Sequence, residues 1–175
     1  IIAANRERAN LMQEHYRLCS TPLVIQNISA YQEENLGASD LNRLYPVLNR
    51  ENRNTIRLVF QGYLSADRGV ISSIEALKSL PANFELILVG SGPESDMIAI
   101  DEAITLFGVA NRVQLLGRVP REHLFDILKT CDIGIVYYHT RTLNHLYCAS
   151  NKIYEYAQAG LPSICTCQPP LRSIH

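Results

Sequence analysis

The sequence predicts an α/β domain in which helices cover both faces of a parallel β-sheet. From residue 55 onward, short apolar runs alternate with amphipathic stretches of helical length. This order is typical of parallel sheets built from helical crossovers. The apolar runs do not alternate strictly with polar residues, as expected of strands buried on both faces. Three successive runs end in glycine, at Gly62, Gly90 and Gly117, which marks the strand ends where the chain turns toward the next helix.

The first part of the chain has a less regular pattern. Residues 1–3 predict the end of a buried strand, residues 5–19 an amphipathic helix, and residues 23–25 a short apolar strand. Residues 26–54 are polar and rich in asparagine. We expect one helical turn there, near residues 41–45, and otherwise an irregular connection.

The length of this polar stretch suggests a boundary between domains, because such long loops are uncommon inside one compact domain. We therefore expect the end of a preceding domain at residues 1–27, a linker at 28–54 and a ligand-binding domain at 55–175. The chain begins within a strand and ends soon after another one. From this we expect a fragment that is truncated at its carboxyl end.

The regular part should contain five strands and four helices. The expected strands are residues 56–62, 84–90, 113–117, 133–137 and 163–166. The expected helices are residues 67–80, 93–107, 120–130 and 151–159. Pro93 occupies what should be a first helical position, which favours proline, and Gly108 and Gly160 should end the helices that precede them.

Composition excludes several classes of protein. The net charge is −1, so nucleic acid is not an expected partner. No apolar run reaches the roughly 18 residues that a membrane-spanning helix needs. The five cysteines include no C-x-x-C pair, which argues against zinc and a disulfide framework and favours free thiols in the cytoplasm. No metal or cofactor is expected.

The helix predicted near residue 151 has the most informative start. Ser150 or Asn151 can cap it, and Lys152 and Glu155 lie in its first turns. A helix start with a lysine attracts anions, and a carboxylate one turn later can accept hydrogen bonds from sugar hydroxyls. The alternative is an exposed Lys–Glu pair on an ordinary helix. The face expected to point inward carries Ile153, Tyr156 and Ala157.

Two further places at the carboxyl ends of the strands could bind a ligand, since parallel sheets bind there. Arg68 precedes Gly69 at an expected helix start, which suits an anion; the alternative is a solvated arginine. The corner from Gly90 to Gly92 begins like a dinucleotide fingerprint, but the third glycine is missing. Arg118 could accept a 2′-phosphate, so a nicotinamide site remains a distant alternative. For the glycines at the strand ends, the alternative is that they serve only to form the turns there.

Five motifs occur in a recognisable order and resemble the carboxyl-terminal domain of GT-B glycosyltransferases, family 4 in particular. The motifs are Gln61-Gly62 with Arg68-Gly69 and Glu75-Ala76; residues 88–93; Val113 with Leu116-Gly117; residues 131–135; and Asn151-Lys152 with Glu155-Tyr156 and residues 159–162. This resemblance covers residues 54 to the end and implies a Rossmann-like sheet. Residues 1–27 are similar to the end of the acceptor domain that precedes it.

The resemblance implies a donor site for a nucleotide-diphosphate sugar. Arg68, Lys152, Gly62, Ser150 and Asn151 would lie at the diphosphate. Glu155 would bind the ribose, and Val119, Arg118 and Gly92 would lie beside the nucleobase. The implied reaction is transfer of a hexose-type sugar, with retention of configuration and without a metal. The acceptor would be a saccharide or a lipid-linked molecule held by the preceding domain, for instance in cell-surface polysaccharide synthesis.

The sequence departs from the family pattern at two places. Tyr63 stands where a second basic residue is usual, and Tyr147 stands where an acid is usual. The catalytic residues are therefore left unassigned, and His139 and His145 are only loop histidines near the expected site. We expect a donor-binding part without activity of its own, in the cytoplasm or peripheral to the inner face of the membrane. The alternatives are a non-catalytic GT-B-like binding or assembly domain and a nucleotide-sugar epimerase.

Overall fold

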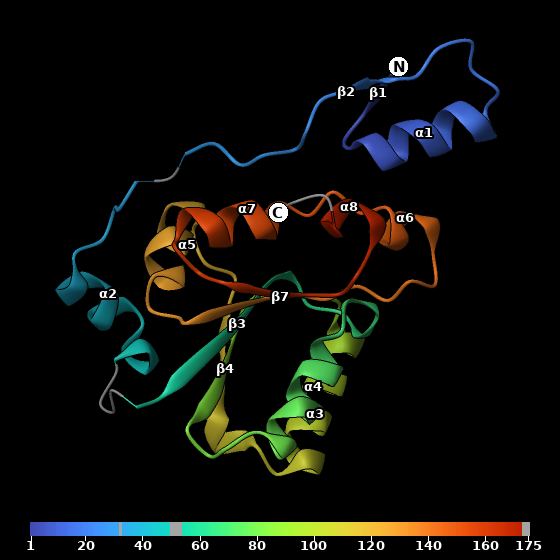
Figure 1. Cartoon of the computed structure of the whole chain (residues 1–175). Coiled ribbons are helices and arrows are strands. Elements are labelled where there is room, and N and C mark those ends of the chain that lie inside the picture. The colour runs from blue at the N-terminus through green and yellow to red at the C-terminus, as the bar shows by residue number, and fades with distance from the viewer. Residues whose placement is uncertain (32, 50–53, 173–175) are drawn as a thin grey trace.

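The computed structural model describes residues 1–31, 33–49 and 54–172 (Figure 1). Its main body is a five-stranded sheet with the strand order β5-β4-β3-β6-β7, and each neighbouring pair is parallel. The strands are β3 (Ile56–Tyr63), β4 (Phe84–Ser91), β5 (Val113–Gly117), β6 (Ile133–Val136) and β7 (Ser163–Cys165). The predicted α/β fold with a parallel sheet is confirmed.

The order of the strands creates a switch point at the centre of the sheet. The chain enters at β3, continues outward through β4 and β5, and then returns to the other side of β3 to form β6 and β7. The crossovers on the two sides therefore run in opposite directions along the sheet. In open parallel sheets, this arrangement leaves a crevice at the carboxyl ends of the two central strands, here β3 and β6.

Both faces of the sheet are covered by helices (Figure 1). On β3, Leu58 and Phe60 pack with the core on one face, while Val59 packs with the core on the other. This alternation explains why the strand is apolar without a polar side. The first core includes buried residues of α3 (Val70–Ala76) and α4 (Glu94–Phe107), and the second includes residues of α5 (Arg121–Leu128) and α7 (Asn151–Gln158). The remaining short helices of this body are α6 (Leu143–Leu146), α8 (Pro169–Arg172), η2 (Ala66–Arg68), η3 (Leu77–Ser79) and η4 (Ala110–Arg112).

Three details differ from the sequence-based expectations. The helix expected from residue 67 begins only at Val70, because Gly69 has φ +76° and separates α3 from the preceding turn. Pro93 is the N-cap of α4 and not its first helical residue. Ala157 is exposed, whereas Tyr156 is fully buried and contributes to the core with the half-buried Ile153.

The beginning of the chain forms a small unit of its own. Strands β1 (Ile2–Ala3) and β2 (Leu23–Val24) pair in parallel and are joined by α1 (Arg6–His15). Asn5 caps α1, because its side chain accepts a hydrogen bond from the Arg8 amide at 2.7 Å. The Asn5 side-chain amide also donates to the carbonyl groups of Tyr147 and Cys148, each at 3.3 Å. These bonds hold the start of α1 against the loop before α7.

The connecting segment, residues 25–55, includes α2 (Ala38–Leu44) and η1 (Pro46–Leu48). The expected helical turn near residues 41–45 therefore lies within a longer helix. The connecting segment is attached to α5 just before α2: the carboxylate of Asp126 accepts hydrogen bonds from the backbone amides of Asn35 and Leu36, at 3.1 and 3.0 Å. The part of the linker expectation that falls on residues 32 and 50–53 lies outside the described residues, as do residues 173–175 at the end of the last domain.

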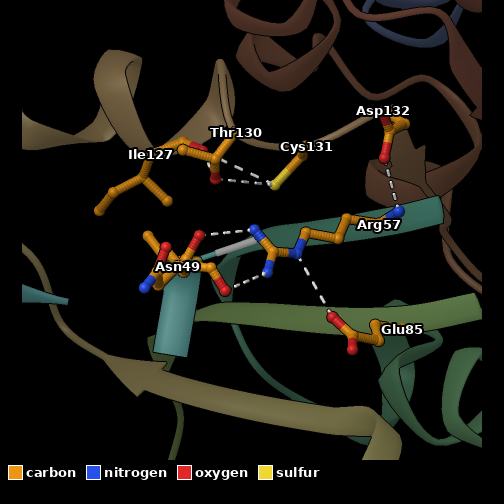
Figure 2. Close-up of polar contacts among 8 residues, drawn as sticks. Asn49, Arg57, Glu85, Ile127, Thr130, Cys131 and Asp132 are labelled. Atoms are coloured by element: carbon orange, nitrogen blue, oxygen red, sulfur yellow. Dashed lines mark hydrogen bonds and ion pairs between the residues drawn. The ribbon is translucent and has the colours of Figure 1, made fainter. Parts of the chain in front are cut away.

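The far end of the connecting segment is bound to the sheet by a buried arginine (Figure 2). The Arg57 side chain on β3 is 4% exposed and donates to the carbonyl groups of Leu48 at 2.7 Å and Asn49 at 3.3 Å. Its Nε lies 3.3 Å from a carboxylate oxygen of Glu85 on β4. The Arg57 amide also donates to Asp132 at 2.7 Å. One side chain therefore fastens η1 to the amino ends of β3 and β4.

Among the described residues, no helix combines the length and apolar character needed to cross a membrane. The cysteines are free, and two of them, Cys131 and Cys148, are buried.

Candidate functional site

A pocket of about 660 Å³ lies at the carboxyl ends of the central strands. Its walls come from the end of β3, the end of β4, the turn after β5, the loop before α7 and the first turns of α7. Ala4, Arg8 and Asn27, from the small unit at the start of the chain and the residues after it, also line it. The volume lies in the range typical of small-molecule sites, and its position is the one that the switch point predicts.

The pocket is strongly cationic. Of the described residues that line it, five are arginine or lysine and one carries a carboxylate. The five are Arg8, Arg68, Arg118, Arg121 and Lys152, and the carboxylate belongs to Glu155. Because the whole chain is nearly neutral, this concentration of positive charge is local. Such a site attracts an anion and lowers the free energy of its bound form.

Lys152 is the most unusual of these cations, since its side chain is 7% exposed and its Nζ has no hydrogen-bond partner among the described residues. Nζ lies 4.4 Å from the ring centre of Phe60 and 5.2 Å from that of Tyr138. Burial, and secondarily the charge of Arg68, lower the pKa of Lys152 to about 8. The alternative of an exposed Lys–Glu pair is therefore wrong for this helix.

An ammonium group buried between two aromatic rings loses its hydration. The cation–π contacts replace only part of that stabilisation, because they are weaker than hydration. An anionic ligand in the pocket would supply the missing hydrogen bonds. The side-chain oxygen of Asn151, the first residue of α7, is likewise buried without a hydrogen-bond partner among the described residues. Ser150 is the N-cap residue, but its hydroxyl makes no cap and instead accepts from the Tyr138 hydroxyl at 3.4 Å.

Arg68 lies in the turn η2 and is half-buried. Its guanidinium carbon lies 5.2 Å from the ring centre of Tyr63 and 5.9 Å from that of Tyr138. Tyr138 therefore contacts both Arg68 and Lys152, and the three side chains form one wall of the pocket. The alternative of a freely solvated arginine does not fit this stacking.

Glu155 faces the pocket from the second turn of α7 and is held at both of its oxygens. Oε1 accepts from the hydroxyl of Ser29 at 2.9 Å, and Oε2 accepts from the side-chain amide of Gln61 at 2.6 Å. Sequence reasoning identified Glu155 but neither partner. Gln61 is a polar residue near the carboxyl end of a mostly apolar strand, and that was a usable signal. Ser29 lies 126 positions away from Glu155 and gave none.

The other side of the pocket is formed by Arg118, Val119 and Gly90, where the ends of β4 and β5 meet. Nε of Arg118 donates to the hydroxyl of Ser91 at 2.6 Å, which orients the guanidinium across the strand ends. Gly92, predicted beside this group, does not line the pocket. A Cβ there would lie 1.8 Å from the Leu64 carbonyl oxygen, so the glycine permits close backbone packing instead.

The structure thus brings eight of the nine predicted site residues to one pocket, all except Gly92. It adds several that the sequence reasoning did not single out, among them Arg8, Arg121, Tyr138 and Cys148. His145 lines the pocket, but His139 does not. Burial raises the pKa of the Cys148 thiol, against the opposing charges of Arg8 and Lys152, so this cysteine favours its neutral form. The described residues contain no group of three or more His, Cys, Asp or Glu side chains suited to a metal.

Comparisons with known proteins give a consistent result. Residues 55–174 match the family model described as "Glycosyl transferases group 1". Solved structures with the same fold include HepE (Alr3699) from Anabaena in complex with UDP and glucose, with a TM-score of 0.79 and 19% identity. A glycosyltransferase from Rickettsia africae follows at 0.76 and 17%, and WaaG, a glycosyltransferase involved in lipopolysaccharide biosynthesis, at 0.68 and 21%.

Each of these structures is much longer than the chain. The alignment covers 99% of the chain but 46% of HepE, and 97% of the chain but 44% of the other two proteins. The chain therefore spans less than half of their length. No curated protein sequence matches it.

Proposed function

This chain belongs to the group 1 glycosyl transferases, and we propose from this that its cationic pocket binds the nucleotide-diphosphate part of a sugar donor. The observation that carries the proposal is the buried ammonium group of Lys152, which has no hydrogen-bond partner in the part of the chain that the structure describes, in a pocket with four arginines. A diphosphate carries enough negative charge and enough acceptor oxygens to satisfy such a group. HepE, whose fold this chain shares, was crystallised with UDP and with UDP-glucose.

The diphosphate would lie against Lys152 and Arg68. Arg68 can approach from the η2 turn, and Lys152 from the first turn of α7. The free amides at the start of α7, around Ser150 and Asn151, would add hydrogen bonds because α7 has the eight residues and the dipole of a regular helix. Gly62 lies beside the Lys152 stem, where a Cβ would meet its Cε at 3.3 Å. A side chain at position 62 would therefore reduce the space for the ligand.

The nucleoside would extend from Glu155 on α7 toward Arg118 and Val119. The carboxylate of Glu155 would accept hydrogen bonds from the ribose hydroxyls, and the base would lie against Val119 and Arg118. Gly92 has no part in this arrangement, since it does not line the pocket.

The chemistry of transfer gives these cations a role beyond binding. When the bond between the anomeric carbon and the diphosphate oxygen breaks, the leaving diphosphate gains negative charge. Lys152 and Arg68 would stabilise that charge where it develops, which lowers the barrier. No metal is needed if the protein provides these cations. We propose a retaining transfer of a hexose-type sugar to a saccharide or lipid-linked acceptor. The reaction would take place in the cytoplasm or at the inner face of the membrane, as a step in cell-surface polysaccharide synthesis.

A second candidate is a non-catalytic binding or assembly domain on the same fold. It is favoured by the scarcity of acids in the pocket, since Glu155 is the only carboxylate among the described residues that line it. Tyr147, which stands where the family usually has an acid, is bonded to Asn5 and Arg8 through its backbone carbonyl group. An epimerase has less support, because its proton transfers would require further acids or bases there.

Calorimetric titration of the full chain with UDP, GDP, UDP-glucose and NADPH tests the donor-site proposal. We expect one nucleoside diphosphate to bind, and we expect Glu155→Ala and Arg68→Ala to weaken its binding by about tenfold or more. Glu102→Ala and Arg43→Ala are matched controls, since both residues are exposed and lie outside the pocket. NADPH binding without nucleoside diphosphate binding, or unchanged affinity in both site variants, would contradict the proposal. Binding without turnover of any nucleotide sugar would favour the second candidate.

A further inference from the structure

The carboxylate of Glu155 accepts hydrogen bonds from two residues in distant parts of the chain. Ser29 reaches it from the connecting segment, with its hydroxyl 2.9 Å from Oε1. Gln61 reaches it from the end of β3, with its amide nitrogen 2.6 Å from Oε2. Each oxygen of the carboxylate therefore has its own donor, and the two donors approach from different elements.

Both donors are held firmly. Gln61 is 3% exposed, and its backbone belongs to the central strand of the sheet, where it pairs with Val89 of β4. Ser29 is 8% exposed, and its carbonyl group accepts from the side-chain amide of Gln158 at 3.1 Å. Since Gln158 lies one turn beyond Glu155 on α7, Ser29 is attached to the same face of that helix at two points.

This arrangement restricts a side chain that would otherwise be mobile. A free glutamate has three rotatable bonds, and a carboxylate offers about four acceptor positions. Two positions are occupied by Ser29 and Gln61, which fixes the plane of the carboxylate and leaves about two for another donor. Of the three residues, Gln61 and Glu155 line the pocket, whereas Ser29 does not. Ser29 can therefore act on a ligand only through Glu155.

We propose that Ser29 and Gln61 are positioning residues that orient the Glu155 carboxylate toward the two neighbouring hydroxyls of a ribose, and that they thereby determine selectivity for ribonucleotides over deoxyribonucleotides. The proposal rests on the proposed function of the pocket. The proposal adds to that function an assignment of selectivity to two residues outside the predicted site, one of which, Ser29, does not line the pocket.

The test compares the affinity for UDP with that for 2′,3′-dideoxy-UDP, and likewise GDP with 2′,3′-dideoxy-GDP, in the full chain by calorimetry. The wild type should prefer the ribonucleotide. Ser29→Ala and Gln61→Met should each reduce this preference by about threefold to tenfold, because each loses one hydrogen bond to the carboxylate. Their affinity for the dideoxynucleotide should stay within about twofold of the wild type. Gln114→Met is the matched control, since Gln114 is a half-buried strand glutamine outside the pocket.

The dideoxynucleotide distinguishes positioning from general structural damage, which would weaken both ligands equally. Equal weakening, or an unchanged preference in both variants, would overturn the proposal. If Gln61→Met does not fold, as judged by circular dichroism, Ser29→Ala decides the question alone. A wild type that binds both nucleotides equally would overturn this inference and leave the diphosphate site intact. A wild type that binds none of the four would overturn the proposed function itself, and this inference with it.

Discussion

Replacing Lys152 with methionine should make the ligand-free protein more stable and its ligand complex weaker. The two side chains have similar length and volume, but methionine carries no charge. The ammonium group of Lys152 is buried, without a hydrogen-bond partner among the described residues, between the rings of Phe60 and Tyr138. Methionine suits such a place between aromatic rings. The variant therefore removes an electrostatic cost while it keeps the packing.

The size of this cost follows from the pKa of Lys152. Burial lowers it from the ordinary 10.5 to about 8. Since one pKa unit corresponds to about 1.4 kcal/mol, the charged side chain should cost the folded state about 3 kcal/mol. The charge of Arg68 contributes to the lowering, whereas Cys148 and Glu155 act in the opposite direction. We expect the variant to gain about 2–4 kcal/mol in free energy of unfolding at pH 7.

The stability difference between the variant and the wild type should depend on pH. Below pH 8 the lysine is protonated in both the folded and the unfolded chain, so the wild type bears the full cost. Between pH 8 and 10.5 the folded state loses the proton first, and the cost disappears as pH rises. The advantage of Lys152→Met should therefore shrink by about 2 kcal/mol between pH 7 and 9.5. Urea denaturation of both proteins at a series of pH values measures this difference.

The same substitution should reverse its effect when nucleoside diphosphate is present. Loss of a charge-assisted hydrogen bond should weaken UDP binding by about tenfold to a hundredfold at pH 7. In the wild type, affinity should fall as pH rises above 8, because the free protein then loses the proton on which binding depends. Refutation would come from a variant that is less stable than the wild type at pH 7, or from a stability difference that does not change with pH.

The fold offers two further tests. Gly90→Ala should lower the free energy of unfolding by at least about 2 kcal/mol, because Gly90 has φ +128° and a Cβ there would lie 1.9 Å from the Gly62 carbonyl oxygen. Gly37→Ala is the control, since a Cβ at position 37 would meet no atom within 4 Å. Similar melting temperatures for the two variants would contradict the reasoning. Arg57→Met should lower the free energy of unfolding, measured by urea denaturation, by about 2–3 kcal/mol, since it removes the side-chain donor to the buried Leu48 carbonyl and to the Glu85 carboxylate. A loss below about 0.5 kcal/mol would show that the guanidinium is dispensable.

The parallel sheet could be predicted from the sequence because its signals are local. Each strand from β3 to β7 is a short apolar run, and the glycines at the ends of β3, β4 and β5 adopt positive φ angles that few other residues tolerate. The helix boundary at Gly69 was missed, since an amphipathic pattern continues through this residue although its left-handed conformation interrupts the helix.

The site was predicted where residues adjoin a strand end or a helix start. Lys152 and Glu155 were placed correctly in the first turns of α7. The burial of Lys152 could not be predicted, because it depends on Phe60 and Tyr138 from two other elements. Contributions from Arg8 likewise arise from packing between the two ends of the chain, and a one-dimensional pattern carries no information about such contacts.

Three attachments fix the connecting segment to the larger sheet and its helices. Ser29 is attached to α7, residues 35–36 are attached to α5, and residues 48–49 are attached to Arg57. These three places are therefore joined to the larger body, while the Ile25 amide donates to the Ala3 carbonyl of β1. Residues 26–28 therefore make the backbone connection between the small unit and the first attachment at Ser29. Arg8 of the small unit is also bonded to Asn144 and Tyr147 beside the pocket, so side-chain bonds join the small unit to the pocket wall in addition to the backbone.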